Sequence, residues 1–139
     1  MRDWWFFDEG WSRRVVTGNV VSRFATEQTA TARLLLPEVR PYTVVMRLHP
    51  IDVTGGPEQN VDVTLNDRAI ASLPLVWNPD RMGEYRVEIP AEVLRPGLNE
   101  LAFRSSRMMP VGEGTEIFPE LPRDQPVAFR LWYVVIVPR

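Results

Sequence analysis

Apolar and polar residues alternate along most of this chain, and this period-two pattern limits what the chain can fold into. In residues 42–50, the side chains of Tyr42, Val44, Met46 and Leu48 share one predicted face. Such alternation is typical of a β-strand with one face against a core and the other in water. The same pattern recurs in residues 29–36, 61–65 and 85–89. No long stretch has the three- and four-residue spacing of a helix, so we predict an all-β chain.

The breaks between these segments are those expected between strands. Asn66 and Asp67 separate two short strands and predict a hairpin turn, because both residue types tolerate positive φ. Residues 90–97 predict a single helical turn, residues 105–126 a long loop, and residues 127–138 a central strand that is apolar on both faces. About eight or nine strands at this spacing predict a sandwich or a barrel. We favour an antiparallel β-sandwich of the jelly-roll type.

Composition favours one globular domain spanning residues 1–139. Hydrophobic residues make up 45% of the chain and charged residues 24%, and there is no cysteine. All 16 basic residues are arginines, and they are scattered along a chain whose net charge is -2. A nucleic-acid partner is not expected, because no basic stripe is present to neutralise phosphates.

The N-terminus does not resemble a signal peptide. Acidic residues interrupt the apolar residues near Met1, where a secretory signal would have a continuous apolar segment. The longest apolar run, residues 131–137, is far shorter than the ~20 residues that a membrane helix needs. We expect no membrane insertion, and the residues alone leave the cellular location open.

The sequence contains no set of residues that predicts catalysis. His49 is the only histidine, and no serine has the glycine-flanked context of a nucleophile elbow. The 18 acidic residues provide many possible carboxylate pairs by chance, most of them in predicted loops. We therefore predict that the protein is not an enzyme, although a small hydrolase using His49 or a carboxylate pair would require a deep cleft.

A ligand-binding surface is predicted around Trp77. This tryptophan lies in a turn-rich segment and is followed by Asn78, Asp80 and Arg81. Pyranose C–H faces stack on aromatic rings, while planar polar side chains bind the hydroxyl groups. Trp77 could equally close one end of the sandwich. Trp11 follows a glycine and precedes polar residues, so both a core position and a ligand-binding role remain open for it.

The N-terminal strand suggests a different function. Trp4 and Phe6 share one predicted face, and Trp5 and Phe7 share the other. A strand that is apolar on both faces is either central in a sheet or an edge in contact with another surface. We therefore keep a protein partner at this strand as an alternative. Trp132, in the last apolar segment, is predicted to lie in the core.

Two stretches together resemble galactose-binding-like jelly-roll domains, the fold of carbohydrate-binding modules appended to glycoside hydrolases. Residues 61–75 resemble the strand–Asn-Gly–strand hairpin of that family, with Asp67 in place of the usual glycine. Residues 85–104 resemble the segment that follows the hairpin. The matching positions are Asn66, Pro96, Gly97, Asn99, Leu101 and Phe103.

The resemblance implies a noncatalytic module that binds or positions carbohydrate and often holds calcium. A structural calcium ion would use Asp8 and Glu9; no other cofactor is expected. Residues 10–12 and 23–37 also resemble soluble domains of bacterial envelope glycosyltransferases, which implies an extracytoplasmic location and a role in cell-envelope glycan machinery. We thus predict a bacterial carbohydrate-binding-like module, and the alternative is a structural or protein-interaction sandwich without a sugar site.

Overall fold

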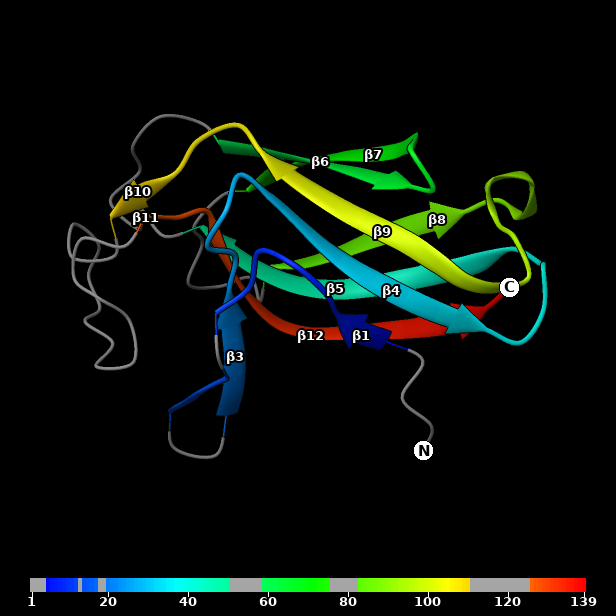
Figure 1. Ribbon diagram of the computed structural model, residues 1–139, viewed down its shortest axis with the longest axis horizontal. Coiled ribbons are helices and arrows are strands. Elements are labelled where there is room, and N and C mark those ends of the chain that lie inside the picture. The colour runs from blue at the N-terminus through cyan, green and yellow to red at the C-terminus, as the bar shows by residue number, and fades with distance from the viewer. Residues whose placement is uncertain (1–4, 13, 18–19, 51–58, 76–82, 111–125) are drawn as a thin grey trace.

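The chain forms two five-stranded antiparallel sheets that face each other (Figure 1). The computed structural model describes residues 5–12, 14–17, 20–50, 59–75, 83–110 and 126–139. In spatial order, the first sheet contains β1 (Trp5–Phe7), β4 (Thr29–Leu36), β9 (Gly97–Ser105), β6 (Gln59–Leu65) and β7 (Arg68–Leu75). The second contains β2 (Val15–Thr17), β3 (Val20–Phe24), β12 (Phe129–Pro138), β5 (Tyr42–Pro50) and β8 (Glu84–Ile89).

Two short strands and one helical turn complete the described structure. β10 (Met109–Pro110) pairs with β11 (Pro126–Val127), so the ends of the predicted 105–126 loop are joined by a small ladder. A 3-10 turn, η1 (Ala91–Val93), lies where the sequence predicted a helical turn. Among the described residues, no helix is long and apolar enough to cross a membrane.

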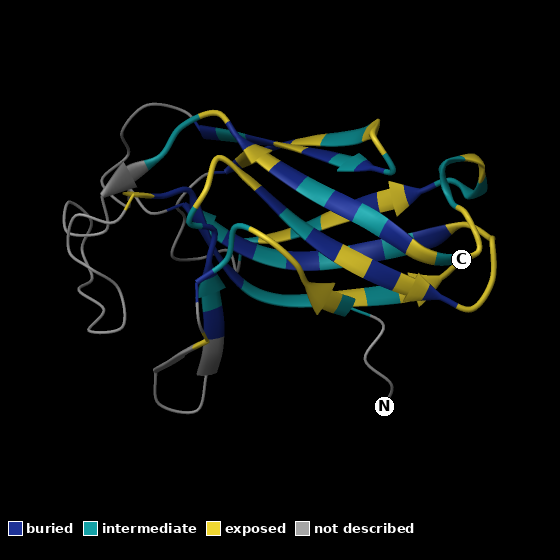
Figure 2. Ribbon diagram, viewed as in Figure 1, coloured by how far each residue is buried: buried dark blue, intermediate teal, exposed yellow. Residues whose placement is uncertain are grey.

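The predicted alternation is confirmed in the strands that form the core. Every second residue of β5 is buried, from Tyr42 to Pro50, and the residues between them are half-buried. β6 and β4 show the same alternation, visible as dark and light bands along the strands (Figure 2). The buried faces of both sheets contribute to one hydrophobic cluster. Burial of each large side chain in it contributes about 1.5–3 kcal/mol to folding.

Aromatic rings connect the two sheets. Phe103 on β9 and Phe129 on β12 lie with ring centroids 5.9 Å apart, although they belong to opposite sheets. Trp11 contacts both rings, with its centroid 5.8 Å from each. Trp5 reaches Phe103 at 6.2 Å from the edge strand β1. This group fixes the spacing of the two sheets near the N-terminal strand.

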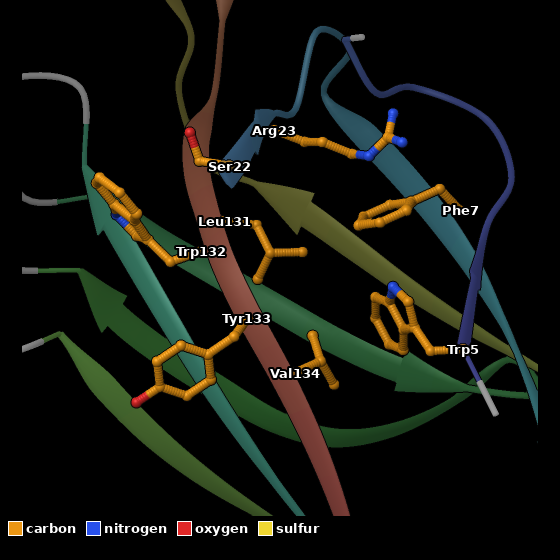
Figure 3. A pocket seen from close by; sticks show the side chains of 8 residues that line it. All are labelled: Trp5, Phe7, Ser22, Arg23, Leu131, Trp132, Tyr133 and Val134. Carbon is orange, nitrogen blue, oxygen red and sulfur yellow. The ribbon is translucent and has the colours of Figure 1, made fainter. Parts of the chain in front are cut away.

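β12 is the central strand of its sheet, as predicted, but a bulge interrupts it. Leu131 pairs with Leu48 and Tyr133 pairs with Arg47, so Trp132 is an extra residue without an opposite partner on β5. A bulge bends its strand and re-aims the side chain at that position. The prediction that Trp132 lies in the core is therefore wrong: it is half-buried and points to the side of β12 away from Trp5 (Figure 3).

Candidate functional site

The predicted stacking residues Trp77, Asn78, Asp80 and Arg81 lie outside the described residues. The segment that contains them, 76–82, joins Leu75 at the end of β7 to Gly83 just before β8. Gly83 has φ +63°, and its carbonyl accepts a hydrogen bond of 2.9 Å from the Leu48 amide. A Cβ at this position would overlap the Leu48 carbonyl and the His49 ring. Gly83, the residue that follows this segment in the sequence, is thus held close against β5.

Trp11, the other predicted ligand residue, is part of the aromatic group between the sheets. Its ring is half-buried, and its indole Nε1 donates a 2.7 Å hydrogen bond to the Thr31 carbonyl. The rings of Phe7, Phe103 and Phe129 surround it at centroid distances of 5.1, 5.8 and 5.8 Å. These contacts account for a tryptophan at this position without a ligand.

Asp8 and Glu9, the predicted calcium ligands, follow β1. The Asp8 carboxylate accepts hydrogen bonds from Thr31 Oγ1 at 3.2 Å and Arg33 Nε at 3.4 Å. Glu9 is exposed, and its backbone carbonyl accepts a 2.8 Å bond from the Thr31 amide. In the described part of the chain, no three acidic, histidine or cysteine side chains come together as a metal site. Asp8 is paired with an arginine, an arrangement that stabilises the turn after β1.

The described residues next to Gly83 form what we call the arginine–tryptophan cluster: Arg47 and His49 on β5, and Arg130 and Trp132 on β12. The guanidinium of Arg130 lies over the Trp132 ring, 3.9 Å from its centroid, and that of Arg47 lies 5.1 Å from it. Trp132 Nε1 donates a 3.0 Å hydrogen bond to His49 Nδ1. Because Nδ1 is the acceptor, a neutral His49 has its proton on Nε2.

The two guanidiniums differ in how they are held. Arg130 is only 6% exposed, and its Nε donates a 2.8 Å bond to Ser22 Oγ, also buried. Arg47 Nε is buried and has no hydrogen-bond partner among the described residues. A buried donor without an acceptor costs about 1–3 kcal/mol.

One carboxylate lies beside the cluster. Tyr133 donates a 2.8 Å hydrogen bond to Glu84 Oε2. This bond, together with desolvation and the Glu84 charge, raises the pKa of Tyr133 above its ordinary value. With the half-buried Arg47, the indole of Trp132 and the phenol of Tyr133 together, and Arg130 buried behind the indole, this region is suited to binding oxygen-rich groups through charge-assisted hydrogen bonds.

A cavity of about 270 Å³ lies beside β12, and its lining includes Trp132 and Tyr133 as well as Trp5, Leu131 and Val134 (Figure 3). Leu131 and Val134 point from β12 toward Trp5, whereas Trp132 and Tyr133 point the other way (Figure 3). Phe7 and Arg23 line the end of the cavity near β3. Sequence reasoning found neither this cavity nor the arginine–tryptophan cluster, since both depend on how β12 is placed.

Comparisons with known proteins identify the fold. No protein-family model matches the chain, and no curated protein matches it significantly. Among solved structures, it is similar to a family 35 carbohydrate binding module from Clostridium thermocellum, with TM-score 0.53 and 10% identity, over 98% of this chain and 89% of that one.

Two further structures show the same likeness. One is a second family 35 module structure from Clostridium thermocellum, with TM-score 0.52 and 8% identity, over 96% of this chain and 92% of that one. The other is a family GH115 4-O-methyl-α-glucuronidase with specificity for decorated arabinogalactans, with TM-score 0.59 and 11% identity. This chain covers 16% of that enzyme, and 96% of this chain is aligned. The fold is therefore the jelly-roll β-sandwich of carbohydrate-binding modules, as the resemblance predicted.

Proposed function

We propose that this protein is a noncatalytic carbohydrate-binding module whose glycan site lies where segment 76–82 meets the arginine–tryptophan cluster. The observation that supports it is the chain of contacts from Gly83 to His49 and from His49 to Trp132. Through these contacts, Gly83, which follows the segment containing Trp77 in the sequence, lies beside the arginine–tryptophan cluster. The shared fold is consistent with this function but does not establish it.

In the proposed mechanism, both segment 76–82 and the arginine–tryptophan cluster contact the sugar. Trp77 stacks on the apolar face of a pyranose ring, and Asn78, Asp80 and Arg81 bind its hydroxyl groups. Arg47, whose side chain is half-buried, provides a further guanidinium donor to a sugar oxygen. We also propose that the glycan is a component of the bacterial cell envelope.

The test is binding of the purified protein to a glycan array that includes envelope polysaccharides, with and without calcium, followed by tryptophan fluorescence titration. For a glycan that binds, Trp77→Ala should lower affinity at least tenfold, about 1.4 kcal/mol or more. Arg47→Met should weaken binding as well. The matched control is Arg68→Met, because Arg68 is exposed on β7 in the other sheet. Failure of a folded protein to bind any glycan in either condition would overturn the proposal.

A protein-interaction role is the second candidate, and one observation favours it. Phe6, on the N-terminal strand β1, is 46% exposed; Trp4 lies outside the described residues. Leu35 and Leu98, which pair on the outer face of the same sheet, are 45% and 49% exposed. The cavity beside β1 would accept a side chain of such a protein partner.

A further inference from the structure

The two edges of β12 differ in how much of their length pairs with a neighbouring strand. One edge pairs with β5 from Phe129 to Pro138. The other edge pairs with β3 at Arg130 and Leu131 only, because β3 then diverges from β12 and pairs with β2 (Figure 1). From Trp132 to Pro138, the second edge therefore has no partner strand among the described residues.

This edge, unpaired within the described part of the chain, lacks the protection that edge strands usually have. Residues 132–138 include no charged side chain, and their single proline is at the far end. Val135 and Val137 are 42% and 46% exposed. Natural sheets normally guard an edge of this kind with charged side chains or prolines, since unpaired amides and carbonyls recruit another strand.

The cavity lies along the same edge. It is lined by Leu131, Trp132, Tyr133 and Val134 on β12, by Trp5 and Phe7 on β1, and by Ser22 and Arg23 on β3. At about 270 Å³, it is large enough for one branched aliphatic side chain. The indole Nε1 of Trp5 is buried and has no acceptor in the described part of the chain. A small rotation of this ring toward an inserted carbonyl would satisfy it.

Arg23 gives the cavity a charge. Its guanidinium lies 4.5 Å from the centroid of the Phe7 ring and donates a 3.0 Å hydrogen bond to the Ser12 carbonyl. No ion pair between Arg23 and a carboxylate occurs among the residues that the structure places. Because a guanidinium has five N–H donors, most of its capacity remains for an anionic partner at this end of the cavity.

We propose that the unpaired edge of β12 binds an extended peptide segment of a protein partner by strand addition. The added strand runs antiparallel to β12, in the same direction as β3, so its C-terminal end lies next to Arg23. An aliphatic side chain of the peptide occupies the cavity beside Val134. An acidic side chain two residues further along, on the same face of the strand, pairs with Arg23. This site does not depend on glycan binding.

The first test uses a seven-residue fluorescein-labelled peptide, Thr-Val-Thr-Ile-Thr-Asp-Thr amide, and measures its fluorescence anisotropy with the full chain. Saturable binding is expected, and replacing the aspartate by lysine should lower affinity at least tenfold. Arg23→Glu should reverse that preference. Arg86→Glu makes the same charge change on β8, at the other edge of the sheet, and should leave binding unchanged.

The second test addresses the cavity and the edge. Val134→Phe fills the cavity and should abolish binding, while a native circular-dichroism spectrum shows that the variant folds. Amide hydrogen exchange in residues 133–137 should slow when the peptide is bound.

Three results would overturn the proposal. One is no binding of the peptide by the folded wild-type chain, and another is equal affinity for the aspartate and lysine peptides. The third is a wild-type dimer in light scattering that Val135→Lys converts to a monomer, because the edge would then pair with a second copy. Glycan binding is measured separately, so its failure leaves this test interpretable.

Discussion

The two asparagines that support the family resemblance have structural roles. Asn66, with φ +50°, forms the β6–β7 turn together with Asp67 at +68°. Its side chain donates a 2.8 Å hydrogen bond to Asn99 Oδ1 and another of 2.9 Å to the Val93 carbonyl. Asn99 is buried, and its Nδ2 donates to the carbonyls of Arg95 and Gly97. These residues therefore identify the fold and do not form a ligand site.

Tyr133 predicts a change of stability at alkaline pH. Its hydroxyl donates to the Glu84 carboxylate, so ionisation would lose this bond and place two negative charges together. The pKa of Tyr133 is thus raised above its unfolded value of about 10. The resulting stabilisation is complete below that value and is lost as pH rises through the folded pKa.

An absorbance titration of the phenolate checks this prediction. Glu84→Gln should lower the Tyr133 pKa toward its ordinary value, and Tyr133→Phe should remove the corresponding step from the titration. Urea unfolding across the alkaline range should show a steeper loss of stability in the wild type than in Tyr133→Phe. Identical titration curves for the wild type and Glu84→Gln would contradict the assigned hydrogen bond.

At the scale of the element, alternation was enough to predict strands and their buried faces, but it failed in β12. In β5 and β6, the apolar positions are unambiguous because the intervening residues are more polar. β12 is apolar on both faces, so its sequence gives no indication of where the register changes. The bulge at Trp132 alters the alternation for the rest of the strand, and both the arginine–tryptophan cluster and the cavity depend on it.

Gly83 and Gly97 both have positive φ, so replacing each by alanine compares an added methyl group at a packed position with one at an open position. Gly83 has φ +63° and lies against Leu48 and His49, whereas Gly97 has φ +84° and no atom within 4 Å of an added Cβ. Gly97→Ala should cost about 1 kcal/mol from backbone strain alone. Gly83→Ala should cost clearly more, because the added methyl group must also displace the backbone of β5.

Chemical denaturation of the two alanine variants measures this difference. Gly83→Ala should also weaken glycan binding, since Gly83 would move away from His49 and from the cluster, and Gly97→Ala should not. Equal destabilisation by the two substitutions would show that the contact between Gly83 and β5 has no energetic importance.

At the scale of the whole molecule, the aromatic group of Trp5, Trp11, Phe103 and Phe129 joins the two sheets. Trp11→Ala should lower the free energy of unfolding by about 3–5 kcal/mol, the range found for loss of a large aromatic side chain from a core. Trp11→Phe retains a ring and loses the bond to Thr31, so it should cost only about 1 kcal/mol.

Urea denaturation and glycan titration of both Trp11 variants separate the two interpretations that the sequence left open. A stability loss with unchanged affinity would assign Trp11 to the core. Unchanged stability with reduced affinity would instead make it a ligand residue.

The sandwich itself was predictable, because its core strands alternate and its hairpin turn has a recognisable sequence. The candidate site was predictable only in part. Trp77 and its polar neighbours are conspicuous in the sequence, and they remain a prediction. Arg47 and His49 lie more than 80 residues before Arg130 and Trp132 in the chain. Only the antiparallel register of β5 and β12, in which Arg130 lies opposite His49, brings them together.

The central position of β12 also has a consequence for biosynthesis. β3 and β5 each have one edge that pairs with β12, yet a ribosome completes both strands long before Phe129 is translated. At about 5–20 residues per second, the nascent chain exposes these apolar strands for several seconds before their partner emerges. During this interval, their unpaired edges are open to incorrect pairing, including pairing between neighbouring chains on the same messenger RNA. The first sheet, whose strands are all complete by Ser105, can assemble earlier and cover one face of them.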